Sequence, residues 1–242
     1  MRVISHPDYS IRSVPLTRPF IWLACGWDDL LHHRMSSLLY GVIVSALGIL
    51  IVAYERHPFY LAAAISGFLL VGPILAAGLC ELSRCSDRNL PTDFNSSLKV
   101  LRRNHDSLLG VANRLLFISV SWFVFSFLLM QAWMTAVAPD IHQTVGGDVL
   151  RHLSEQQLFS YLICGGILAV IVFALSVVTI PMIVDRHVDA RTAIRTSIRV
   201  AIKDLPVMLV WSALIVVLVL IGFATWMIGI VVIFPLLGHA TW

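Results

Sequence analysis

The feature that most constrains this chain is a long apolar run that contains a proline and ends abruptly at charged residues. The run GFLLVGPILAAGLC begins at Gly67 and has no charged side chain, and Glu81 and Arg84 come next. Such a run followed by charge is typical of a helix that crosses a membrane and leaves it at one end. Similar runs precede Asp185 and the C-terminus, so the pattern predicts several membrane helices.

Composition places the chain among integral membrane proteins. Of its 242 residues, 58% are hydrophobic and 13% are charged, whereas soluble domains contain about 25% charged residues. The four cysteines, Cys25, Cys80, Cys85 and Cys164, are scattered, and their spacing matches neither a zinc site nor a disulfide framework. We therefore expect an all-α, polytopic membrane helix bundle, without a soluble domain large enough to hold an independent active site.

The apolar runs predict six transmembrane helices arranged as three hairpins. The expected spans are about 37–54, 58–82, 115–138, 158–184, 207–222 and 225–238. The last two divide a charge-free stretch that would be about 46 Å long as one helix, which is too long for one ordinary crossing. Gly229 precedes Pro235 by the same interval that separates Gly67 from Pro73, which favours a turn near residues 222–226; a single long span is the alternative.

Three amphipathic helices are expected to lie in the membrane interface, one before each hairpin. The first begins at Thr17, the second follows Thr92 as its cap, and the third follows Asp189 and is closed by Pro206. The third has an apolar stripe: Ala190, Ala193, Ile194, Ile198, Ala201, Ile202 and Leu205. Residues 1–16 are expected to form a mobile tail, and residues 17–242 a single transmembrane domain.

Basic residues predict the orientation of the bundle. Fifteen of the 17 lysines and arginines lie in the N-terminal region up to Arg34 and in the two long polar segments, whereas the external turns hold only Arg56 and Arg151. The positive-inside rule then places both termini in the cytoplasm. Four of these residues form a basic stripe on the third amphipathic helix: Arg191, Arg195, Arg199 and Lys203. The stripe fits a solvated face, contact with anionic lipid headgroups, or a specific partner.

A polar cluster at the cytoplasmic end is the main candidate site. Its five members follow the repeated prolines and should converge: Glu81, Arg84, Asp185, Arg186 and His239. The cluster is either an ion-pair network that ties the hairpins together or a site for a lipid headgroup, a small anion or a partner subunit. Helix kinks and close helix contacts are expected at small or cyclic residues, namely Gly67, Gly72, Pro73, Gly78, Pro181, Gly229 and Pro235.

Several classes of chemistry have no support in the sequence. The centres of the spans carry almost no charge, which argues against an ion-coupled transporter. None of the nine histidines falls at the centre of a span, and we expect none to be buried, which argues against an integral haem. No catalytic, metal or nucleic-acid motif is recognisable. We therefore expect no catalytic residue, no metal, no cofactor and no nucleic-acid partner.

A set of short motifs carries a family resemblance. The motifs are Trp27, Tyr40–Gly41, Gly67–Pro73, Gly78–Leu79, Glu81–Arg84, Ser176–Pro181, Asp185–Arg186, Trp211 and Pro235–Trp242. In them the chain resembles a bacterial integral-membrane family of uncharacterised function, some of whose members are automatically labelled cytochrome c oxidase subunit I. The resemblance runs from about residue 20 to residue 242. It implies the bacterial inner (cytoplasmic) membrane as the location.

The oxidase label does not fit a catalytic role. A catalytic oxidase subunit is a much longer bundle with histidines buried in several spans. We therefore expect a non-catalytic accessory or assembly subunit of a membrane complex, such as a respiratory complex, with a membrane protein or a second copy as partner. The alternative is a small transporter or lipid-handling protein with a headgroup or anion site. A continuous water-accessible cavity between the hairpins would favour transport, and a solid bundle with an exposed small-residue groove would favour the subunit.

Overall fold

The computed structural model is all-helical over the residues that it describes, which are 9, 11–53, 58–134 and 154–242. The expected all-α class is confirmed there, and no described residue lies in a strand. The predicted turn at 55–57, residues 139–153 of the predicted external loop and most of the predicted tail lie outside the described residues. The helices are α1 (Arg18–His32), α2 (Arg34–Ala53), α3 (Pro58–Asp87), α4 (Phe94–Arg103), α5 (His105–Met134), α7 (Glu155–Ser176), α8 (Thr179–Arg186), α9 (Ala190–Lys203), α10 (Leu205–Ala224) and α11 (Ile230–Ala240).

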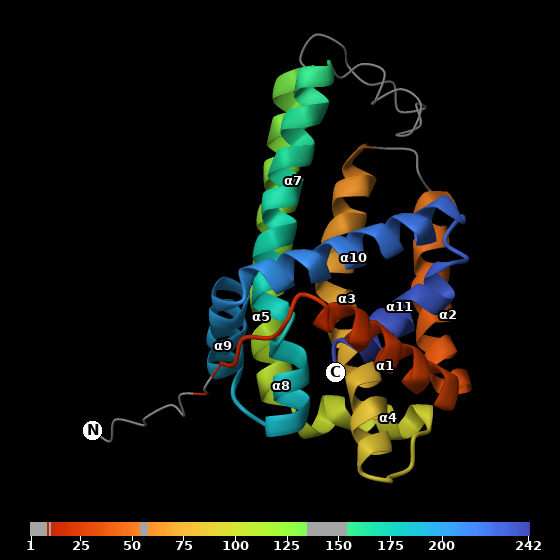
Figure 1. Ribbon diagram of the computed structural model, residues 1–242. Helices are drawn as coiled ribbons and strands as arrows, with labels where there is room; N and C mark the ends of the chain where they lie inside the picture. Colours follow the sequence, from red (N-terminus) through yellow and green to blue (C-terminus); the bar gives the residue numbers. More distant parts are fainter. Residues whose placement is uncertain (1–8, 10, 54–57, 135–153) are drawn as a thin grey trace.

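Within the described residues, three segments are long and apolar enough to cross a membrane. They are His105–Leu129, Glu155–Arg186 and Leu205–Ala224, and α1 with the first part of α2 adds a fourth if this pair, bent by 106°, is one broken span. Their outward faces are apolar, and Phe117 on α5 is 73% exposed, as expected for side chains that meet lipid. In Figure 1, α5 and α7 run together, whereas α10 crosses α3 and α5 steeply. The six-span arrangement of three hairpins therefore stays a prediction.

The charge-free stretch near the C-terminus is divided into two helices. Residues 225–229 form a turn between α10 and α11, and Trp226 and Met227 have positive φ angles of 51° and 67° in it. The 11 residues of α11 extend about 16 Å, which is about half of a hydrocarbon core. The helix found there is therefore shorter than the span predicted at 225–238. The chain ends beside α3, because Trp242 Nε1 donates to Asp87 Oδ2 at 2.8 Å.

Glycines allow α11 to pack closely on its neighbours, as small residues do in membrane bundles. A Cβ atom at Gly41 of α2 would collide with the backbone carbonyl of Val231, and one at Gly26 of α1 with the backbone of Ala240. Of the glycines predicted to make close contacts, Gly78 meets the Tyr40 hydroxyl and Gly229 meets Thr225, whereas Gly72 has open space around it. Gly67 lies in α3, in a part whose packing is outside the description.

The predicted fourth span, 158–184, lies within one segment long enough to cross a membrane, Glu155–Arg186, and its helix is interrupted between α7 and α8, just before Pro181, where a kink was expected. The Ser197 hydroxyl of α9 donates to the Ala174 carbonyl at 2.7 Å and accepts from the Val178 amide at 3.2 Å. These are the two groups that would bond each other in a regular helix, so the hydroxyl is inserted into the ladder. Pro181 cannot donate to Val177, and it is accommodated in the first turn of α8. The break is therefore the joint result of a serine and a proline.

The boundaries of the amphipathic helices differ in detail from the prediction. Asp189 caps α9 as expected, by accepting from the amides of Arg191 and Thr192. The cap of α4 is Asp93 instead of Thr92, because a carboxylate accepts the Ser96 amide there. Pro206 lies in the first turn of α10 instead of closing α9.

Two further segments differ from the prediction. The apolar stripe of α9 is split: its alanines are buried beside Thr196 and Ser197, whereas Ile202 is 72% exposed. The third span begins earlier than predicted, because α5 starts at His105.

The N-terminal segment next to α1 is bound to the rest of the protein. Residues 11–16, predicted to be part of a mobile tail, run past the junction of α9 and α10. Lys203 Nζ donates to the Ile11 carbonyl at 2.8 Å, and the Val14 amide donates to Asp204 Oδ2 at 3.1 Å. These two hydrogen bonds hold residues 11–16 against the junction of α9 and α10, so that Arg12 and Val14 line the cavity next to α9.

The close contact at Gly41 yields a prediction about stability. In Gly41→Ala, the new methyl group would meet the backbone of α11, which cannot move aside, so we expect a loss of about 1–3 kcal/mol in the free energy of unfolding. The matched control is Gly166→Ala on α7, where an added Cβ meets nothing within 4 Å. That change should be neutral or slightly stabilising, because alanine favours helix. Denaturation of both variants in detergent micelles measures the difference, and equal effects would contradict the packing described.

Candidate functional site

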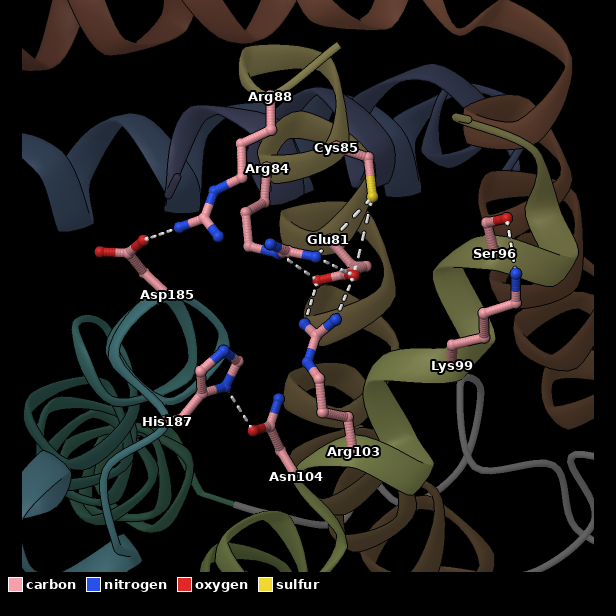
Figure 2. Close-up of polar contacts among 10 residues, drawn as sticks. All are labelled: Glu81, Arg84, Cys85, Arg88, Ser96, Lys99, Arg103, Asn104, Asp185 and His187. Carbon is pink, nitrogen blue, oxygen red and sulfur yellow. Dashed lines mark hydrogen bonds and ion pairs between the residues drawn. The ribbon is translucent and has the colours of Figure 1, made fainter. Parts of the chain in front are cut away.

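A buried carboxylate held by two guanidinium groups forms the centre of the polar end of the bundle (Figure 2). Glu81 is 2% exposed. It accepts bonds of 2.7 and 2.6 Å from Arg84 and of 2.9 and 2.6 Å from Arg103. Bidentate pairs of this kind are among the strongest polar contacts in proteins. One negative charge thus faces two positive charges, and the group keeps a net positive charge.

The helices explain why these side chains meet. Helix α3 continues past the predicted end at residue 82 to Asp87, so that Glu81 and Arg84 lie one turn apart on the same face. Arg103 lies in the last turn of α4, and α4 is attached to α2 because the hydroxyls of Tyr40 and Ser97 bond at 2.7 Å. Arg103 was not among the predicted cluster residues, and no local pattern identifies it, since it lies far from Glu81 in the chain.

A second, more exposed group lies beside the first. Asp185 at the end of α8 accepts from Arg88 of α3 at 3.1 Å and pairs with its neighbour Arg186 at 3.0 Å. Figure 2 shows Arg88 reaching from α3 toward Asp185, next to Arg84. The structure therefore brings together four of the five predicted cluster residues as two adjacent ion-pair groups. Arg88 joins them, although it was not among the predicted cluster residues.

His187 connects this region to the loop between α4 and α5. It adopts a left-handed conformation with φ of 53°, and its Nδ1 bonds Asn104 Oδ1 at 2.9 Å. Partial burial and the positive charges of Arg103 and Arg84 lower the pKa of His187 below its ordinary value. A lowered histidine pKa is the expected consequence of an excess of positive charge nearby.

The fifth predicted residue, His239, lies apart from the arginines. It is 2% exposed, so the expectation that no histidine is buried was wrong. Its Nε2 bonds the Ser37 hydroxyl and its Nδ1 the Ser83 hydroxyl, both at 2.8 Å. Ser83 in turn donates to Asp29 Oδ2 at 2.5 Å. Because the hydroxyl has only one proton to donate, its oxygen accepts the bond from His239, and Nδ1 is the protonated nitrogen. This chain of bonds joins α1, α2, α3 and α11.

A cavity of about 600 Å³ adjoins the second ion-pair group. It lies among α1, the break between α7 and α8, the start of α10 and the C-terminal residues. One part of its lining is apolar and aromatic, and includes Val177, Met208 and the edge-to-face pair Trp22 and Trp211, whose ring centres are 5.6 Å apart. The charged part consists of Arg12, Asp185, Arg186 and Asp204.

The predicted basic stripe of α9 lies on the surface of the protein. All four residues of the basic stripe on α9 are exposed, and Lys203 is bonded to the Ile11 carbonyl. Among the described residues, no three histidine, cysteine or acidic side chains are grouped so that they could hold a metal.

A family comparison covers the central part of the chain. Residues 61–185 match the model of a family described as "Predicted integral membrane protein (DUF2189)", which is just over half of the 242 residues. The chain belongs to this family. The expected membership of an integral-membrane family of unknown function is thus confirmed. The matched part of this DUF2189 protein includes Glu81, Arg84, Arg103 and Asp185, and stops before α9. No curated protein and no solved structure is similar enough to give a match.

The pair of guanidinium groups at Glu81 yields a prediction about stability. Glu81→Gln leaves Arg84 and Arg103 without the buried negative charge, and we expect a loss of about 3–5 kcal/mol in the free energy of unfolding. Arg103→Gln should cost less, because Arg84 still pairs with the carboxylate. The control is Asp106→Asn, whose side chain is fully exposed, with an expected change within about 0.5 kcal/mol. Equal stability of the Glu81 and Asp106 variants in micelles would show that the carboxylate is not needed.

The lowered pKa of His187 yields a prediction about pH. The unfolded chain binds a proton at His187 more readily than the folded protein does. The contribution of neutral His187 to the stability of the folded protein is therefore complete above the ordinary pKa of about 6.5, and it is lost as the pH falls through the lower, folded value. His187→Asn keeps a residue that tolerates positive φ and removes the titration. The melting temperature of the wild type should therefore fall more steeply on acidification than that of the variant. Parallel curves would contradict the assignment.

Proposed function

We propose that this DUF2189 protein binds a membrane lipid through its headgroup in the cavity beside α9. The observation that carries the proposal is the cavity itself, whose lining combines an aromatic and apolar part with two arginines and two aspartates. A lipid presents the same combination of a charged headgroup and an apolar chain. The alternative named from the sequence, a lipid-handling protein with a headgroup site, is thus the function that the geometry supports best.

The size and chemistry of the cavity suit such a ligand. Small-molecule sites have volumes of about 300–1,000 Å³ and are lined mainly by apolar side chains with a few polar groups, which matches the cavity of about 600 Å³. Tryptophans are favoured at the depth of lipid headgroups, and Trp22 and Trp211 lie in its lining. Arg12 and Arg186 supply planar donors suited to phosphate oxygens.

The surroundings of the cavity support the same ligand class. The basic stripe of α9 is exposed close to the cavity, and each basic residue near an anionic membrane surface contributes about 1 kcal/mol of attraction. The distribution of lysine and arginine supports an orientation with both termini and the cavity on the cytoplasmic side of a bacterial inner membrane. In this orientation the stripe and the cavity face the same headgroup layer.

A second candidate function is the accessory or assembly subunit. One observation favours it, which is a face of small residues on α7. Gly166 and Ala169 are both exposed, and an added Cβ at Gly166 would meet nothing within 4 Å. Small residues on an exposed helix face let another membrane helix approach closely, from a partner protein or from a second copy of the chain.

Filling the cavity tests the lipid function. Val200 lines the cavity, and Val200→Trp should occupy the space of the ligand. Ile202→Trp, on the same helix but 72% exposed, is the matched control. Native mass spectrometry of protein purified in mild detergent should show a retained lipid in the wild type and the control, and at least a tenfold lower lipid occupancy in Val200→Trp.

The same spectra separate the two candidate functions. Equal lipid occupancy in all three proteins, or no retained lipid in any, would overturn the lipid site. A stoichiometric protein partner in a lipid-free sample would favour the subunit role, and Gly166→Leu should then release that partner.

A further inference from the structure

Asp204 is a buried acidic side chain in the lining of the cavity. It is 8% exposed and lies at the junction of α9 and α10, where its own amide donates to the Val200 carbonyl at 3.0 Å. Its carboxylate accepts one bond, from the Val14 amide to Oδ2 at 3.1 Å. It is the N-cap residue of α10, but its side chain makes no capping hydrogen bond, and among the described residues no cation forms an ion pair with it. The carboxylate is therefore directed at the cavity with unused acceptor capacity.

None of the neighbouring cations among the described residues forms an ion pair with Asp204. Lys203 precedes Asp204 in the chain, yet its Nζ donates to the Ile11 carbonyl. Arg186 lines the same cavity but pairs with Asp185, and Arg12, which also lines it, is exposed. A buried carboxylate without a cation is unfavourable, so the position of Asp204 at a cavity indicates a ligand that brings the positive charge.

We propose that the lipid bound in this cavity is zwitterionic, with a primary ammonium group bound by Asp204 and a phosphate bound by Arg12 and Arg186. This inference rests on the proposed function, and it narrows the ligand class to aminophospholipids of the phosphatidylethanolamine type. Both charges of such a headgroup find a partner in the lining. A purely anionic lipid would leave Asp204 without a cation and place a negative charge near it.

The ammonium group is assigned to Asp204 and not to Asp185 because Asp185 is already shared by Arg88 and Arg186. A primary ammonium is favoured over a quaternary one because it donates hydrogen bonds, and Asp204 needs a donor. Quaternary ammonium groups are instead recognised by the faces of several aromatic rings, whereas Trp22 and Trp211 pack edge to face on each other at an interplanar angle of 85°.

A headgroup comparison tests the inference on the full-length protein. Delipidated protein in micelles is mixed with phosphatidylethanolamine, phosphatidylcholine or phosphatidylglycerol that carry the same acyl chains, and occupancy is measured by native mass spectrometry. We expect the wild type to bind phosphatidylethanolamine at least fivefold more tightly than either of the others. Asp204→Asn keeps the shape and the bond from Val14 but removes the charge, and it should abolish this preference while phosphatidylglycerol binding is kept or increased. Asp106→Asn is the matched control and should bind like the wild type.

The outcomes separate this inference from the proposed function. If the wild type retains lipid that Val200→Trp releases, but does not prefer phosphatidylethanolamine, the zwitterionic assignment fails and the lipid site stands. If Asp204→Asn keeps the wild-type preference, the role of Asp204 is wrong. Free phosphoethanolamine at the same concentration should not displace the lipid, and displacement would assign the site to a soluble ligand. The wild-type comparison decides the headgroup class even where the variant is unstable.

Discussion

The arrangement of the polar end depends on Glu81, a carboxylate whose burial is unfavourable without positive partners. It obtains them from two elements, Arg84 on its own helix and Arg103 on α4, so that the end of α3 and the amphipathic helix α4 are fixed together. Two residues further along α3, Ser83 links Asp29 and His239. One turn of α3 therefore contacts α4 on one side and α1 with α11 on the other. These contacts position the amphipathic helices α1 and α4.

The candidate lipid site is assembled from parts that lie far apart in the chain. The N-terminal segment contributes Arg12, the end of α8 contributes Asp185 and Arg186, and the junction of α9 and α10 contributes Asp204. The break between α7 and α8 forms part of the lining, since Val177 and Val178 lie in it. A straight fourth helix would change this lining, so the break, the cavity and the proposed ligand are connected parts of one arrangement.

Local sequence patterns predicted the class of the fold, most helix positions and the Asp189 cap, because apolar length and capping chemistry act over a few residues. They predicted the proximity of Glu81 to Arg84 for the same reason. They could not predict that Arg103 completes the pair, that Asp204 is buried or that His239 lies between two hydroxyls, because these contacts join elements that are distant in the sequence. Asp204 does precede Pro206 at a helix start, a pattern that indicates a junction, but nothing local indicates that its carboxylate faces a cavity.

The serine inserted between α7 and α8 has a consequence for the order of biosynthesis. Residues 155–186 leave the ribosome before Ser197 does, so the Val178 amide and the Ala174 carbonyl emerge while they are still free to bond each other. Only the proline then interrupts an otherwise regular helix. The break in the hydrogen-bond ladder is completed by Ser197, which emerges later, when α9 packs against this segment. The shape of the fourth apolar segment is thus completed by the part of the chain that follows it.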